Sequence, residues 1–295
     1  MDALGLGKLS VGAPYFNTIF VPLTTILAGL MGIGMFTRWK STDPKRLLRE
    51  LWAAALVSLV LALGLPFLFG EFNGLVFIGL LAAIWIALAT VRDLLAKTSR
   101  REGRWYGLRQ LSRSYWGMVL GHLGLGVMIV GIAGVSNFAD ERDLRMAPGD
   151  SVTMGRYVFQ LDHIDHVEGP NFIADRAAVK VLNRDGEQVT VLYPEKRNYL
   201  VSRNVMTEAA IDPGLFRDLY VAMGEPLEGG AWAIRLHYKP FVRWIWLGAI
   251  FMALGGLLAV LDRRYRLPFK RESVQMPGAA SPQTTATSAE AAKAS

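Results

Sequence analysis

Four histidines are the residues of this chain most able to bind a metal or to move a proton, and one of them lies within an apolar segment. His122 occurs in YWGMVLGHLGLGVMIVG, about seven residues into a stretch long enough to cross a bilayer. Ionisable side chains inside hydrocarbon are rare and usually functional, as ligands, proton relays or pairing partners. Neutral imidazole is a common axial ligand of haem iron. His122 is therefore predicted to ligate haem iron.

The neighbours of His122 leave a second interpretation open. Gly121, Gly124 and Gly126 make the helix surface around the ring nearly bare, and either a flat macrocycle or the backbone of another helix could use it. In the second case His122 would only bond a carbonyl across a helix interface. A proton relay is less favoured, because no other histidine and no carboxylate lies in the middle of an apolar segment. A second axial histidine would have to come from elsewhere.

The other three histidines give weaker signals. His163 and His166 lie in LDHIDHVEGPN, where three carboxylates could complete a metal site: Asp162, Asp165 and Glu168. The three-residue spacing does not reliably place both rings on one side of an extended segment, so an exposed polar loop is favoured. His237 directly precedes the last apolar segment and is predicted to lie outside the bilayer, too far away to pair with His122.

Two further groups of polar residues could take part in binding. Asp212, Arg217 and Asp218 lie in MTEAAIDPGLFRDLY and could form a docking surface, although turn and ion-pair roles are favoured. Arg113 and Tyr115 stand at the basic end of the fourth apolar segment and could meet haem propionates. Anchoring at the membrane interface is the favoured role for this second pair.

Helices that cross a membrane must position these residues. The chain has 295 residues, 52% of them apolar, and the apolar residues are gathered in blocks. Five blocks approach the length of about 20 residues that a helix needs to span a bilayer. The predicted spans are residues 16–36, 51–70, 73–91, 115–135 and 242–261, so that residues 1–135 form a membrane region with four helices.

The net charge of +7 indicates membrane topology rather than nucleic-acid binding. More than half of the 32 Lys and Arg residues lie after the first span, between the third and fourth spans, or after the fifth. Such residues stay on the cytoplasmic side, where they also meet anionic lipid. This predicts a multi-pass membrane protein, with the N-terminus and residues 136–241 outside and the C-terminus in the cytoplasm.

Residues 136–241 are predicted to form a small all-β periplasmic domain inserted between the fourth and fifth spans. Short β-prone runs alternate there with turn residues. The expected strands are Ser151–Leu161, Ala177–Leu182, Gln188–Tyr193, Asn198–Val201 and Ala231–Tyr238. A hairpin is expected at Asn183-Arg184-Asp185-Gly186 because glycine can adopt positive φ. A barrel or sandwich of about five to seven strands follows from this pattern, and it could also be only a rigid spacer.

Cysteine is absent from the chain, so disulfides cannot hold the external domain and any redox chemistry would need a cofactor. Residues 262–295 are predicted to be basic at first and then to form a disordered cytoplasmic tail. Their composition of Ala, Ser, Thr and Pro lacks the large apolar side chains that could offset the entropy of ordering.

Four segments, taken together in this order, resemble the C-terminal part of the CcmF family, the membrane haem-handling component of cytochrome c maturation. They are LGLGKLSVGAPYFN at Leu4–Asn17, SRSYWGMVLGHLGLGV at Ser112–Val127, MTEAAIDPGLFRDLYVAMGEP at Met206–Pro226 and KPFVRWIWLGAIFMALGG at Lys239–Gly256. The resemblance covers most of the chain.

The resemblance implies a role for His122 that agrees with its position in an apolar segment. In that family a transmembrane histidine of the matching segment is an axial ligand of a b-type haem, and His122 occupies that position. The family haem is thought to take electrons, plausibly from quinol, and to reduce a second haem delivered by the chaperone CcmE. That second haem is then joined to the CXXCH motif of apocytochrome c, a substrate handled by CcmH/CcmI-type proteins.

The departures from the family pattern are equally informative. The tryptophan-rich external segment, its flanking histidines and the second intramembrane histidine have no counterpart here, and the eight tryptophans are scattered. The chain is therefore expected to be the C-terminal portion of a haem lyase subunit, inactive alone and completed by an N-terminal part that supplies the second axial ligand. The alternatives are a non-catalytic membrane scaffold or assembly subunit and, less favoured, a transporter.

Overall fold

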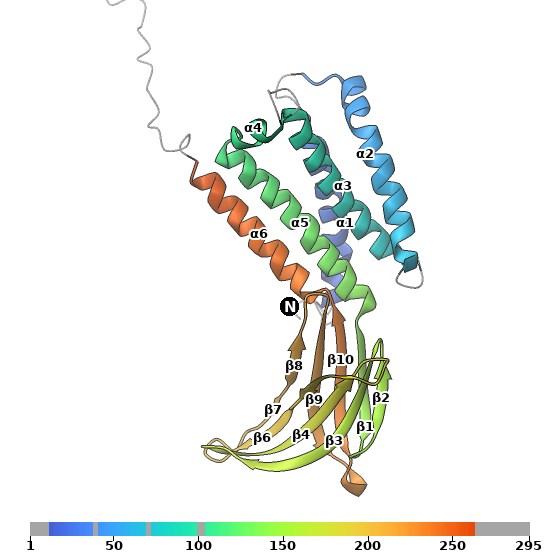
Figure 1. Cartoon of the computed structure of the whole chain (residues 1–295), viewed down its shortest axis with the longest axis vertical. Coiled ribbons are helices and arrows are strands. Elements are labelled where there is room, and N and C mark those ends of the chain that lie inside the picture. The colour runs from blue at the N-terminus through green and yellow to red at the C-terminus, as the bar shows by residue number, and fades with distance from the viewer. Residues whose placement is uncertain (1–11, 38–40, 69–71, 99–103, 263–295) are drawn as a thin grey trace, which may run out of the picture. The chain divides into compact units, whose positions relative to one another are not determined.

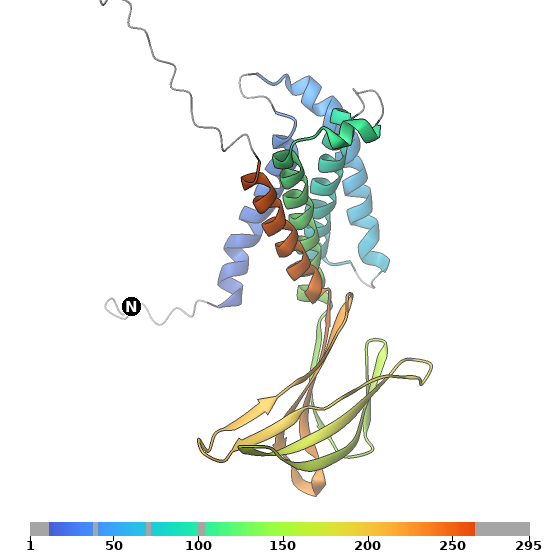
Figure 2. The same ribbon diagram turned by 60° about the vertical axis from the view of Figure 1, so that its left-hand side comes forward.

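The computed structural model describes residues 12–37, 41–68, 72–98 and 104–262 (Figure 1). Five of its helices are long and apolar enough to cross a membrane, which confirms the predicted fold class. They are α1 (Ala13–Gly34), α2 (Pro44–Gly64), α3 (Gly74–Thr98), α5 (Arg113–Phe138) and α6 (Val242–Val260). The short α4 (Arg104–Arg109) precedes α5, and a 3-10 turn (Leu65–Leu68) follows α2. Figure 2 shows the five long helices side by side from a second direction.

Two helices extend beyond the predicted spans at the end of the bundle opposite to the β-domain. α2 begins at Pro44 instead of residue 51, because the Asp43 side chain accepts a bond from the Lys45 N–H at 3.0 Å and proline suits the first helical turn. α3 continues to Thr98 instead of ending at residue 91. The extension of α3 brings Asp93, which the predicted span excludes, into a helix of the bundle.

Glycines seven residues apart bring α5 and α6 into close contact. A Cβ added at Gly124 would lie 2.8 Å from the carbonyl oxygen of Gly248, and one at Gly255 would lie 2.5 Å from that of Gly117. Such distances leave no room for a side chain, so the two backbones touch. Gly117, Gly124 and Gly131 of α5 therefore serve close packing against α6.

The chain between α5 and α6 forms ten strands in two antiparallel sheets (Figure 1). One sheet has the order β1-β10-β9-β8, and the other has the order β2-β3-β4-β6-β7, with β5 also paired to β4. The strands are β1 (Asp140–Met146), β2 (Ser151–Met154), β3 (Tyr157–Glu168), β4 (Phe172–Leu182), β5 (Gln188–Leu192), β6 (Glu195–Tyr199), β7 (Val205–Glu208), β8 (Ala210–Pro213), β9 (Arg217–Pro226) and β10 (Trp232–Pro240).

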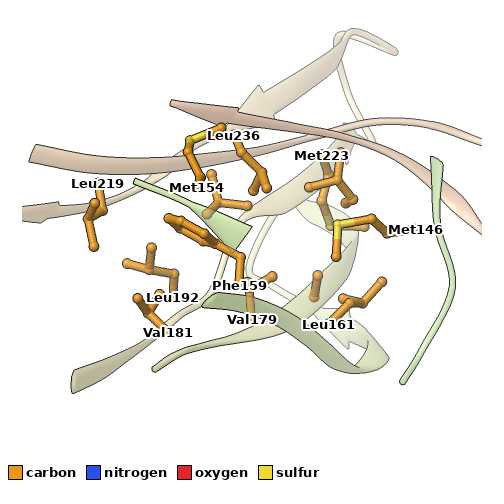
Figure 3. Packing of buried hydrophobic residues seen from close by; sticks show 13 residues of the cluster. Met146, Met154, Phe159, Leu161, Val179, Val181, Leu192, Leu219, Met223 and Leu236 are labelled. Atoms are coloured by element: carbon orange, nitrogen blue, oxygen red, sulfur yellow. The ribbon is translucent and has the colours of Figure 1, made fainter. Parts of the chain in front are cut away.

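The two sheets enclose an apolar core that belongs to the β-domain alone (Figure 3). Phe159 lies between the sheets and is fully buried, with Leu161 beside it on β3 and Val179 on the neighbouring β4. Leu236 and Met223 close the core from the opposite sheet. These residues alternate with polar ones along their strands, as expected for sheets with one buried face.

The strand prediction is right in type and wrong in several details. Ser151–Leu161, expected to be one strand, is the hairpin of β2 and β3, because Gly155 adopts a φ of +61° and turns the chain. The hairpin at Asn183–Gly186 is confirmed, with Gly186 at a φ of +82°. The structure has ten strands rather than five to seven, and β1, β7, β8 and β9 lie outside the predicted runs. The predicted tail falls at residues 263–295, outside the described residues.

Candidate functional site

His122 lies within α5, partly buried, and its ring is held by its own helix. Nδ1 is 2.7 Å from the carbonyl oxygen of Met118, one turn earlier. Because a carbonyl oxygen only accepts, Nδ1 carries the proton and Nε2 holds the lone pair. Histidines that ligate metals commonly donate their other ring nitrogen to a backbone carbonyl in this way. The tautomer of His122 is therefore the one that an axial ligand needs.

His122 shares the face of α5 that packs against α3. Gly126, four residues further on, would place a Cβ 3.4 Å from the carbonyl oxygen of Ala83 in α3. Ala133, eleven residues from His122, is 3.0 Å from a Cβ added at Gly79 of α3. Residues four, seven and eleven apart lie on one side of a helix. His122 is thus turned toward α3 and away from the glycine contact with α6.

The three glycines around His122 have different surroundings. Gly124 contacts the α6 backbone and Gly126 contacts α3, while a Cβ added at Gly121 would meet nothing within 4 Å among the described residues. Helix packing thus accounts for two of the three glycines. Packing does not explain why position 122 is a histidine, because no described residue forms a hydrogen bond with Nε2 of its ring.

A polar cluster that the sequence prediction missed joins α3 to α5 near the start of α5. The Tyr115 hydroxyl donates to Oδ2 of Asp93 at 2.7 Å, and the Lys97 ammonium lies 2.8 Å from the same oxygen. Asp93 is only 6% exposed. Tyr115 is therefore engaged within the bundle, whereas Arg113 is exposed.

A groove of about 570 Å³ opens between α1, α3 and α5 at the end of the bundle from which β1 emerges. Its walls are mostly apolar, and side-chain amides and hydroxyls add polar groups. The polar residues that line it are Asn17, Thr18, Thr24, Thr25, Ser136 and Asn137. Thr25 and Asn137 bond backbone carbonyls of their own helices, so the groove needs no ligand to satisfy them.

His163 and His166 lie in strand β3, not in the polar loop expected for them. Nδ1 of His163 is 2.9 Å from Asp162, and Nδ1 of His166 is 2.9 Å from Asp175 on β4. Each ring thus has its own carboxylate partner. Among the described residues there is no group of three or more metal-binding side chains.

His237 is in β10 and is 7% exposed, which makes it the most buried histidine of the described chain. Its ring packs edge-on against Tyr220, with centroids 4.7 Å apart. Nδ1 is 3.3 Å from a carboxylate oxygen of Glu141, but it forms no hydrogen bond with that oxygen or with any other described residue. His237 is a residue of the β-domain and is not brought to His122.

The contacts of Asp212, Arg217 and Asp218 lie within the β-domain. Arg217 pairs with Asp212 and donates from Nε to the Tyr157 hydroxyl at 3.1 Å, and it is only 17% exposed in its side chain. Asp218 accepts a bond from the Gly214 N–H at 3.1 Å. These contacts match the turn and ion-pair roles favoured from the sequence rather than a docking surface.

The model of the CcmF C-terminal beta-sandwich matches residues 137–240 of this chain. The cytochrome c-type biogenesis protein CcmF of Pseudomonas aeruginosa is 50% identical over 281 residues, which cover 94% of this chain. The protein of the same name from Escherichia coli is 48% identical over 273 residues, covering 92% of this chain. This chain is therefore similar to the C-terminal part of the CcmF proteins.

A solved structure named cytochrome c heme lyase CcmF shares the fold of this chain. The TM-score is 0.68 at 22% sequence identity, over 85% of this chain and 41% of that one. The chain spans 42% of the length of the CcmF protein of Pseudomonas aeruginosa and 40% of that of Escherichia coli. More than half of each of these CcmF proteins therefore has no counterpart in the aligned region.

The described residues fit one axial position of a haem and not two. His122 engages Nδ1 with the Met118 carbonyl and so leaves Nε2 as the ring nitrogen that could bind haem iron. The remaining three histidines of this chain lie in the β-domain. A second protein ligand would have to come from another part of a CcmF protein.

Proposed function

We propose that this chain acts in cytochrome c maturation as the C-terminal portion of a CcmF-type haem lyase, with His122 as one axial ligand of a b-type haem. The observation that carries the proposal is the position of the His122 ring, fixed through Nδ1 to the Met118 carbonyl inside an apolar helix. When bound, the haem would supply the electron that keeps the iron of a second haem ferrous during its attachment to apocytochrome c.

Each part of the chain has a task in this proposal. The Met118 carbonyl orients the imidazole and fixes its tautomer, and the apolar helices around it exclude water. The β-domain faces the periplasm of a bacterial inner membrane, where it meets the partners that the family resemblance implies. These are the N-terminal CcmF part with the tryptophan-rich segment, the haem chaperone CcmE, CcmH/CcmI-type proteins and apocytochrome c.

The groove between α1, α3 and α5 is our candidate for the quinol that the family resemblance implies. Its apolar walls suit a prenyl chain, and the amides of Asn17 and Asn137 suit the oxygens of a quinol ring. The assignment of the groove is independent of the assignment of His122 as a haem ligand. The groove assignment can be wrong while the ligand assignment holds.

The ligand assignment is tested by replacing one side chain in an assembled complex. This chain is co-expressed with the N-terminal part of the Pseudomonas aeruginosa CcmF, and the purified complex is examined by visible spectroscopy. We expect His122→Ala to lower haem content several-fold and to move the Soret band, while His166→Ala, at an exposed histidine of the β-domain, leaves both unchanged.

A non-catalytic scaffold is the alternative function. In that case His122→Ala would leave haem content and the Soret position at their wild-type values, and the histidine would serve only helix packing. Equal spectra for the two variants would therefore refute the proposal.

A further inference from the structure

Asp93 is a buried carboxylate in a membrane helix, and two polar groups share one of its oxygens. Oδ2 accepts the Tyr115 hydroxyl at 2.7 Å and lies 2.8 Å from the Lys97 ammonium. A charge in this position needs a partner, because the cost of desolvation is otherwise too high. Lys97 supplies the opposite charge from the next turn of α3, and Tyr115 supplies a bond from α5.

The three side chains form a closed cluster. The Lys97 ammonium also lies 4.2 Å from the centroid of the Tyr115 ring, a cation–π contact. Each member therefore contacts the other two, which fixes the direction of the Tyr115 ring as well as its hydroxyl. The cluster joins α3 to α5 by a directional bond, as the Ser114 N–H joins α5 to Asp262, just after α6, at 2.9 Å.

The cluster and His122 lie on the same side of α5. Tyr115 precedes His122 by seven residues, two helical turns or roughly 10 Å of rise, so both face α3. On the other side of His122, Gly126 packs against Ala83 of α3. His122 thus lies between a polar contact and a close backbone contact that both join α5 to α3.

We infer that Asp93 and Tyr115 are positioning residues for His122, because their bond sets the rotation and depth of α5 against α3. The direction of Nε2 follows from the rotation of α5, since Nδ1 is tied to the backbone of the same helix. The expected effect on a bound haem rests on the proposed function. The contact between α3 and α5 is a feature of the helix bundle and does not depend on that function.

The haem-linked test uses the complex described above. Tyr115→Phe removes one hydroxyl, Asp93→Leu removes both polar contacts, and Asp93→Asn keeps an oxygen that can accept from Tyr115. Tyr106→Phe makes the matched change at an exposed tyrosine of α4. We expect Tyr115→Phe and Asp93→Leu to shift the reduction midpoint of the bound haem and its absorption bands, with Asp93→Asn partly restoring them and Tyr106→Phe without effect.

Wild-type midpoints and bands in Tyr115→Phe and Asp93→Leu would overturn the inference, even where His122→Ala abolishes haem binding. The latter result keeps the proposed function and removes only the positioning role. Conversely, haem binding that is insensitive to His122→Ala refutes the proposed function without touching the contact between α3 and α5.

A second experiment tests the contact between α3 and α5 without haem. The chain has no cysteine, so the pair Ala83→Cys and Gly126→Cys can report on α5 rotation by forming a disulfide under mild oxidation. We expect Tyr115→Phe to slow cross-linking of this pair severalfold and Tyr106→Phe to leave it unchanged. Equal cross-linking rates in the two backgrounds would overturn the inference.

Discussion

At the scale of single residues, burial separates His237 from the other histidines. Burial beneath its neighbours lowers the pKa of His237 below its usual 6.5, the positive charge of Lys239 adds to this effect, and the Glu141 carboxylate opposes it. The folded β-domain therefore favours the neutral ring. Protonation of the His237 ring is less favourable in the folded domain than in the unfolded chain. The stability of the β-domain therefore depends on pH through this residue.

We expect the β-domain to lose stability as pH falls below about 6.5, because the unfolded chain then binds a proton that the folded domain resists. Above that pH the contribution of His237 is fully present, and it is lost on acidification until the pH reaches the depressed pKa of the folded state. The urea midpoint for proteolytic cleavage within the β-domain, measured from pH 8 to pH 5, follows this change in the full chain.

His237→Gln is the control for this prediction. The variant should show a smaller loss of its urea midpoint between pH 8 and pH 5, because glutamine does not titrate. A loss as large as that of the wild type would assign the effect to other groups. Asp143 and Glu195 act at lower pH, because hydrogen bonds from arginines hold the pKa of each carboxyl below its usual range, against the effect of burial.

The sequence allowed His122 to be singled out, because one histidine in a long apolar segment is visible without any structure. The cluster of Asp93, Lys97 and Tyr115 could not be predicted in the same way. Asp93 and Tyr115 are 22 residues apart along the chain, and only the packing of α3 on α5 makes them neighbours. The predicted third span also ended before Asp93, which hid this carboxylate from a search for membrane polar groups.

At the scale of elements, the contact between α5 and α6 depends on glycines that no other residue can replace. We expect Gly124→Ala to destabilise the helix pair by about 1–3 kcal/mol, the usual cost of overpacking. The added methyl carbon would lie 2.8 Å from the Gly248 oxygen and from Cβ of Phe251. The thermal midpoint of the detergent-solubilised chain should fall accordingly.

Gly121→Ala provides the matched comparison within the same helix. A Cβ at this position has open space around it among the described residues, and alanine is also the better helix former. This variant should keep or slightly raise the thermal midpoint. If both alanine variants melt alike, the glycine contact of α5 with α6 does not limit stability.

Strands were harder to predict than helices, for a physical reason. A membrane helix needs about 20 apolar residues in a row and so gives a strong signal. β1 has the sequence DERDLRM, in which only Leu144 and Met146 are apolar and only Met146 is fully buried. β7 and β8 have four residues each, too short for a visible alternation.

At the scale of the whole molecule, two solvents explain the distribution of apolar residues. The β-domain buries Phe159 and Leu161 completely between its sheets. The helices instead leave large apolar side chains exposed, such as Leu23 at 59% and Val60 at 58%. Burial of the apolar side chains suits a domain in water, and exposure of apolar side chains suits helices in lipid. The two parts of the chain are therefore built for different surroundings.

Three membrane crossings separate the loop between α1 and α2 from the β-domain, so the two must lie on opposite sides of the membrane. We expect the β-domain to be outside, because Lys and Arg residues are concentrated in the loops of the other side. In the cysteine-free chain, Ser202→Cys at the exposed β6–β7 turn should react with a membrane-impermeant maleimide on intact spheroplasts. Ser41→Cys, the same exchange at an exposed position between α1 and α2, should react only after permeabilisation. Labelling of Ser41→Cys but not Ser202→Cys on intact spheroplasts would invert the topology and would contradict the proposed function, in which the β-domain faces the periplasm.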